Sequence, residues 1–129
     1  MDVEFSRDNL QRLIDAIKDD TKQTNLLLLC LQSFEEYHHS IFEMETKLKI
    51  FSYDNMDRRE YQDMRKSLDL SRTLKHNAVL KNLVIINRLA ERAGTPPVYD
   101  GVVSEDHPYR REAADAVMAY IEGIINDRQ

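Results

Sequence analysis

The segment LLLCLQSFEEYHHSIFEMETKLKIF, Leu27 to Phe51, decides the fold because its apolar residues recur at intervals of seven. This spacing is typical of the a and d positions of a helix that packs against another helix along its whole length. It predicts a long helix from Lys22 to Phe51. Two series of residues form the predicted seam: Leu27, Phe34, Ile41 and Leu48 at one position, and Cys30, Tyr37, Met44 and Phe51 at the other.

The segment from Asp57 to Ala93 is the predicted partner of this helix, because it can be phased in the same way. Between the two, the stretch SYDNMD, Ser52 to Asp57, contains Asp and Asn residues that supply a turn and a helix N-cap. We therefore predict a long antiparallel helical hairpin. Its second seam consists of Tyr61, Leu68, Lys75, Asn82 and Leu89 at one position, and Met64, Ser71, Ala78 and Ile85 at the other.

Two polar residues, Lys75 and Asn82, occupy seam positions of the second helix. A polar residue in a seam lowers stability but fixes the register, since a slipped pairing would leave its hydrogen-bonding groups without partners. We interpret both residues as register-setting and expect Asn77, on the opposite side, to face solvent. A second interpretation stays open, in which both helices contribute to a polar pocket formed by Ser71, Lys75, Tyr37 and His38.

Two shorter helices flank the hairpin, from Arg7 to Asp19 with Ser6 as N-cap, and from Pro108 to Asn126. Most of the Gly and Pro residues lie between Gly94 and Pro108, which predicts one substantial loop. At 1.5 Å per residue the hairpin helices span roughly 45 and 55 Å, and the outer helices only roughly 20 and 28 Å. The sequence therefore predicts a single all-α domain, residues 1–129, in which the shorter helices pack at one end of the long hairpin.

The tip of the hairpin is left without cover in this arrangement and is rich in aromatic residues and methionine. Uncovered apolar surface marks an interface, and two-fold dimers are the commonest way to bury it. We predict a homodimer through the tip, or a docking surface for another protein. The alternative is a kink near Asp69 to Arg72 that folds the tip back onto the short helices. The predicted interface residues are Ile41, Phe42, Met44, Leu48, Phe51, Tyr53, Met56, Tyr61 and Met64.

Charge and composition restrict the classes of partner. The net charge of −5 argues against nucleic-acid binding, although basic residues outnumber acidic ones between Asp57 and Ala93. No apolar run approaches the ~20 residues of a membrane span, and the acidic N-terminus is unlike a secretory signal. The single Cys30 fits a reducing compartment. We expect a cytoplasmic protein with no membrane association.

A metal-dependent enzyme or ligand-binding bundle is the alternative function. Glu35 and His38 lie three residues apart on one helix face, as in metal-binding bundles, with His39 beside them and His76 on the second hairpin helix. The sequence contains no phosphate-binding glycine loop, activated nucleophile signature or zinc-type cysteine pairing. We therefore assign no catalytic residue and no cofactor, and favour a non-enzymatic, interaction or regulatory role.

Two segments resemble a small bacterial family of helical proteins of unknown function. They are RTLKHNAVLKNLVIINRLAERAGTPPVYDG, Arg72 to Gly101, and YRREAADAVMAYI, Tyr109 to Ile121. The resemblance covers the C-terminal half of the chain. It implies a bacterial source and an all-helical fold, and it brings no activity or site residues with it.

Overall fold

Four helices form the protein in a computed structural model that describes residues 3–53, 57–103 and 110–127, and for residues 51–53 the backbone alone. They are α1 (Arg7–Ile17), α2 (Thr21–Tyr53), α3 (Arg58–Ala93) and α4 (Arg110–Asp127). The all-α fold predicted from the sequence is confirmed, and the four predicted ranges agree with these bounds to within a few residues. Pro108 and the centre of the predicted turn at residues 54–56 lie outside the described residues.

Local side-chain chemistry sets several of the helix ends. Ser6 has an extended backbone, and its Oγ accepts a hydrogen bond from the Asn9 N–H at 3.2 Å, as predicted for an N-cap. The carboxylate of Asp57 does the same for α3 by accepting from the Arg59 N–H at 3.3 Å. Gly94 ends α3 at φ 73°, a left-handed conformation that costs glycine no steric strain.

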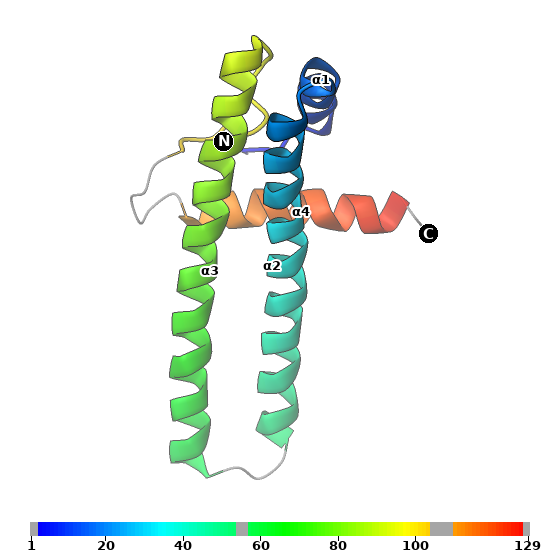
Figure 1. The fold of residues 1–129 in the computed structure, drawn as a ribbon. Coiled ribbons are helices and arrows are strands. Elements are labelled where there is room, and N and C mark those ends of the chain that lie inside the picture. Colours follow the sequence, from blue (N-terminus) through cyan, green and yellow to red (C-terminus); the bar gives the residue numbers. More distant parts are fainter. Residues whose placement is uncertain (1–2, 54–56, 104–109, 128–129) are drawn as a thin grey trace.

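The two long helices lie side by side and antiparallel, α4 crosses behind both, and α1 lies at the end where α2 begins and α3 ends (Figure 1). At 1.5 Å per residue, the 33 residues of α2 and 36 of α3 span about 50 and 54 Å. The 11 residues of α1 and 18 of α4 span only about 17 and 27 Å. α3 runs without interruption through residues 69–72, so the alternative of a kink that folds the tip back is wrong.

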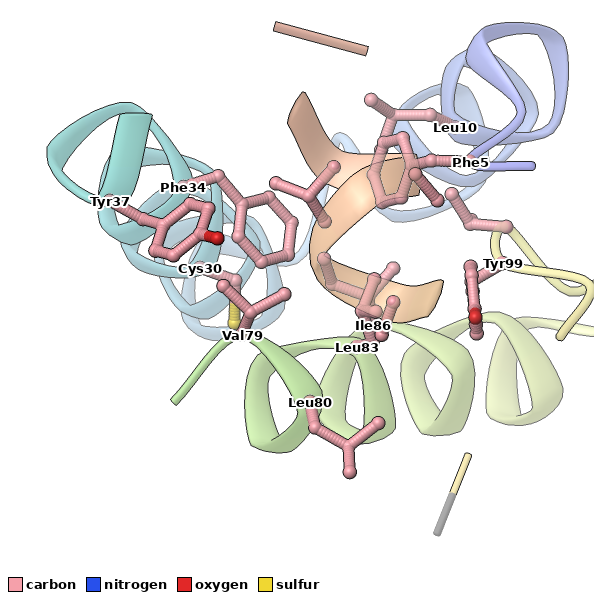
Figure 2. Packing of buried hydrophobic residues seen from close by; sticks show 14 of the residues in the cluster. Phe5, Leu10, Cys30, Phe34, Tyr37, Val79, Leu80, Leu83, Ile86 and Tyr99 are labelled. Atoms are coloured by element: carbon pink, nitrogen blue, oxygen red, sulfur yellow. The ribbon is translucent and has the colours of Figure 1, made fainter. Parts of the chain in front are cut away.

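The hydrophobic core lies where α1 and α4 meet the hairpin. Figure 2 shows side chains from α2, α3 and the N-terminal segment converging on α4. Phe5 packs edge-on against Phe34, with ring centroids 5.7 Å apart, and its ring centroid lies 4.4 Å from that of Tyr120. Small buried residues on α4 allow its backbone to approach the hairpin closely; they are Ala113, Ala114 and Ala116.

The N-terminal segment is held against the loop that follows α3. Phe5 and Tyr99 form an isolated antiparallel bridge, and the Ser6 N–H donates to the Val98 carbonyl at 2.8 Å. The side chain of Asn9 adds a bond to the Pro97 carbonyl at 3.1 Å. These contacts join two segments that are more than 80 residues apart in sequence.

Candidate functional site

The seam between α2 and α3 contains a polar pair at its covered end. Asn82 Nδ2 donates to Ser33 Oγ at 2.8 Å, and both side chains are partly buried. Lys75 is half-buried and makes no hydrogen bond or ion pair in the described part of the chain; it lines a small hollow of about 80 Å³ with Ser33 and Glu36. Within the described residues, Asn82 thus has a hydrogen-bond partner across the hairpin and Lys75 has none, and the register-setting role of both remains a prediction.

A larger hollow of about 430 Å³ lies where α4 crosses the hairpin. Tyr37 and Ile41 of α2, which are buried, belong to its lining. The pocket interpretation named Tyr37 correctly as a lining residue, but Ser71 and His38 line neither this hollow nor the smaller one, and Lys75 lines only the smaller. The remaining lining residues come from all three helices: Glu45, Arg72, His76, Arg111, Asp115 and Met118.

Burial controls the ionisation of the two ring side chains in this hollow. It raises the pKa of the Tyr37 phenol to about 12, and the nearby Asp115 carboxylate adds to the effect. Burial also lowers the pKa of His76, and the Arg72 guanidinium lowers it further, whereas Asp115 acts in the opposite direction. The rings lie 5.8 Å apart between centroids. Near neutral pH the hollow therefore presents an uncharged phenol and imidazole below a rim of mixed charge.

The candidate metal ligands do not come together. Glu35 and His39 are exposed on α2, His38 is half-buried on the same helix, and His76 lies in the hollow on α3. Among residues 3–53, 57–103 and 110–127, no three His, Cys, Asp or Glu side chains are placed to share a metal ion. The geometry gives no support to the metal-dependent alternative.

The predicted interface residues other than Phe42 fall into three groups. Ile41 and Met44 are only 6% and 8% exposed, because they are already buried in the hairpin seam and are not available to a partner. Leu48, Tyr61 and Met64 also lie in the seam but are only half-buried, since no third helix covers them. The side chains of Phe51, Tyr53 and Met56 lie outside the described residues.

The outward-facing apolar residues of the tip form two short stripes. On α2, Phe42 and Ile50 are 64% and 53% exposed and flank the half-buried Thr46 at four-residue intervals. On α3, Leu70 and Leu74 are exposed and also four residues apart. Leu70 and Leu74 were missed as interface candidates. Their four-residue spacing on one outer side of α3 is the signal that could have identified them.

The environment of Asn77 differs from the one expected from the sequence. It was expected to face solvent, but it is half-buried, and its Oδ1 accepts a hydrogen bond from Arg110 Nη1 at 2.9 Å. The physical reason is that the first turn of α4 passes over this side of α3. A two-helix periodicity contains no information about that third element.

Comparison with known proteins identifies one family. A family model described as protein of unknown function (DUF3232) matches residues 2–128, so the similarity extends well beyond the C-terminal half. Neither the curated proteins nor the solved structures include a significant match to this chain. In the described residues, the helices include none with the length and hydropathy required to span a bilayer.

Proposed function

The chain belongs to the DUF3232 family of proteins of unknown function, and we propose that it is a protein-interaction module that acts as a homodimer through its hairpin tip. We define the hairpin tip as residues 42–53 of α2 and 58–74 of α3. The observation that carries the proposal is the incomplete burial of the seam in this region. No residue of α3 before Val79 is buried, although Tyr61, Met64 and Leu68 occupy a and d positions of the heptad and are half-buried.

A pair of helices buries only the line along which the two helices touch, and leaves the flanks of its seam open to water. Helices of globular proteins bury a wider apolar stripe against several neighbours. At the other end of the hairpin α1 and α4 supply those neighbours, and residues such as Phe34 and Leu83 become fully buried there. At the tip none of the other described helices supplies them, so apolar side chains there stay partly or largely exposed.

The exposed apolar side chains support the same conclusion. Apolar residues that are gathered on a surface, rather than scattered singly, mark sites of association. Closed two-fold dimers are the commonest assemblies of soluble proteins, because one self-complementary surface suffices. An exposed Phe42 and Ile50 on one side of α2 provide such a surface without any rearrangement of the helices.

The test is the absolute mass in solution, measured by light scattering behind a sizing column. We expect the wild-type chain to have twice its 15.2 kDa mass, and the Phe42→Ser/Ile50→Ser variant to have the mass of one chain with unchanged helical circular dichroism. Leu29→Ser is the matched control, because Leu29 is equally exposed on α2 but at the covered end. That variant should remain dimeric.

Two outcomes would overturn the proposal. A wild-type chain that remains monomeric at micromolar concentrations excludes the homodimer, and binding of a different protein would then have to be sought at the same surface. A Phe42→Ser/Ile50→Ser variant that remains dimeric would place the interface elsewhere on the molecule.

A further inference from the structure

The outer face of α2 at the hairpin tip carries a self-complementary pattern of charge. The sequence FEMETKLKI, Phe42 to Ile50, has the same apolar pattern when it is read in either direction from Thr46, and its charges are exchanged between the two halves. Acidic residues lie on the N-terminal side of Thr46 and lysines on the C-terminal side. The four positions that flank Thr46 in this way are Glu43, Glu45, Lys47 and Lys49.

Helical geometry divides these charges into two flanks. Phe42, Thr46 and Ile50 form the outward stripe, because residues four apart lie on one side of a helix. Glu43 and Lys47 lie together on one flank of the stripe, where Lys47 Nζ is 3.1 Å from Glu43 Oε1. Glu45 and Lys49, spaced in the same way, lie on the other flank. Each flank thus carries one acid and, four residues further on, one lysine.

We propose that a second copy of the chain binds this face in an antiparallel orientation, with the two-fold axis passing beside Thr46. The proposal rests on the proposed homodimer and names its interface. The two-fold axis is perpendicular to both helices and to the line that joins them. It leaves each flank on the same side of the interface and reverses the order of its residues along the helix. Glu43 then lies beside the partner's Lys47, and Glu45 beside the partner's Lys49. Phe42 packs against the partner's Ile50.

The charges also disfavour the parallel arrangement. In a parallel pair the flank with Glu43 and Lys47 meets the partner's flank with Glu45 and Lys49, and both run in the same direction. Glu43 would then face the partner's Glu45, and Lys47 would face the partner's Lys49. Like charges that face each other across an interface oppose association. The apolar stripe supplies the affinity in either orientation, and the charges select the antiparallel one. Glu45 also lies 3.8 Å from Arg72 in its own chain, and its second oxygen is available to a lysine of the partner.

The first experiment reverses the charges in two complementary variants. Glu43→Lys/Glu45→Lys carries only lysines around Thr46, and Lys47→Glu/Lys49→Glu carries only glutamates. We expect each variant alone to dimerise at least tenfold more weakly than the wild type, and an equimolar mixture to form a heterodimer that native mass spectrometry resolves. Lys81→Glu/Arg88→Glu, a double charge reversal at exposed positions of α3, is the control and should dimerise as the wild type does.

The second experiment determines directly whether the two α2 helices are antiparallel or parallel. In a Cys30→Ala background, Thr46→Cys should crosslink between chains with a short bis-maleimide, because the two copies of residue 46 meet at the axis. His39→Cys, on the same side of α2, should not, since fourteen residues along antiparallel helices separate the two copies by about 21 Å. In a parallel dimer both positions would crosslink.

The outcomes separate this inference from the one on which it rests. If the wild type dimerises and both charge variants also dimerise alone, or if His39→Cys crosslinks as well as Thr46→Cys, the antiparallel α2 interface is wrong while the homodimer stands. If the control Lys81→Glu/Arg88→Glu also dissociates, the change in net charge, and not the pairing of charges across the interface, explains the weaker dimerisation. The inference is then again overturned. A monomeric wild type overturns both.

Discussion

Asn87 is bonded to the backbone of Tyr99 through both ends of its side-chain amide. Its Nδ2 donates to the Tyr99 carbonyl at 3.0 Å, and its Oδ1 accepts from the Tyr99 N–H at 3.1 Å. The same Oδ1 also accepts from the Val98 N–H at 3.1 Å. Because Val98 and Tyr99 are buried, their two N–H groups and the Tyr99 carbonyl depend on this one side chain from α3 for their hydrogen bonds.

Asn87→Ala should therefore destabilise the protein strongly. Three hydrogen bonds are lost, and at about 1 kcal/mol each the free energy of unfolding should fall by about 3 kcal/mol. Urea unfolding followed by circular dichroism measures the loss. Asn77→Ala is the control, because Asn77 makes one bond to a flexible arginine, and it should cost less than about 1 kcal/mol. Equal losses for the two variants would contradict the role assigned to Asn87.

Substitution of two glycines by alanine should have opposite effects on stability. A Cβ added at Gly101 would come within 2.5 Å of the Tyr99 Cζ atom, and this ring is almost fully buried and cannot move aside. Gly101→Ala should lower the free energy of unfolding by about 1 to 3 kcal/mol. Gly123 lies within α4, and apart from the adjacent backbone of that helix no described atom lies within 4 Å of an added Cβ, so Gly123→Ala should raise the free energy of unfolding by about 0.5 to 1 kcal/mol. Thermal unfolding of both variants checks the two signs, and a stabilising Gly101→Ala would show that the Tyr99 ring is free to shift.

The periodicity of the sequence predicts the buried side of α2 well. Six residues of the predicted α2 seam are buried, and they are Leu27, Cys30, Phe34, Tyr37, Ile41 and Met44. In the second half of α3 the same phasing fails. Leu83 and Ile86, outside the a and d series, are fully buried, whereas Ile85 at a d position is only partly buried. The reason is that α1 and α4 cover sides of α3 that no α2 contact reaches.

Contacts made by irregular segments could not be predicted from the sequence. The pairing of Phe5 with Tyr99 joins two short stretches that have no periodic pattern. The large hollow was also not predicted, since it depends on where α4 crosses the hairpin. Of its charged lining, Arg111 and Asp115 come from α4. Only the general expectation of polar residues around Tyr37 could be drawn from the heptads.

The bond between Asn82 and Ser33 should appear as a coupling energy across the seam. In a double-mutant cycle of Ser33→Ala and Asn82→Ala, we expect the two changes to be coupled by about 1 kcal/mol, the net value of one partly buried hydrogen bond. Lys75→Ala with Ser33→Ala is the control cycle, because these residues share a hollow without a hydrogen bond, and its coupling should be close to zero. No coupling between Ser33 and Asn82 would remove the physical basis of a register-setting Asn82.

His76 should make stability depend on pH below neutrality. Its pKa in the folded chain is lowered from 6.5 by burial and by Arg72, so between the two pKa values the unfolded chain binds more protons than the folded one. The contribution of the neutral His76 side chain to the free energy of unfolding is therefore fully present above about pH 6.5. It is lost as the pH falls through the pKa of His76 in the folded chain. We expect the urea midpoint of the wild type to decrease between about pH 7 and pH 5, and to decrease less in His76→Gln.

Asp115 and His39 provide the checks on this assignment. Asp115 opposes the shift at His76, so Asp115→Asn should lower the pKa of His76 further and make the decrease in the urea midpoint steeper. His39 is exposed on α2, and His39→Gln should retain the pH dependence of the wild type. Direct titration of the His76 ring by NMR measures the same pKa in the folded protein. A wild type and a His76→Gln variant with parallel pH profiles would show that the acid sensitivity originates in another group.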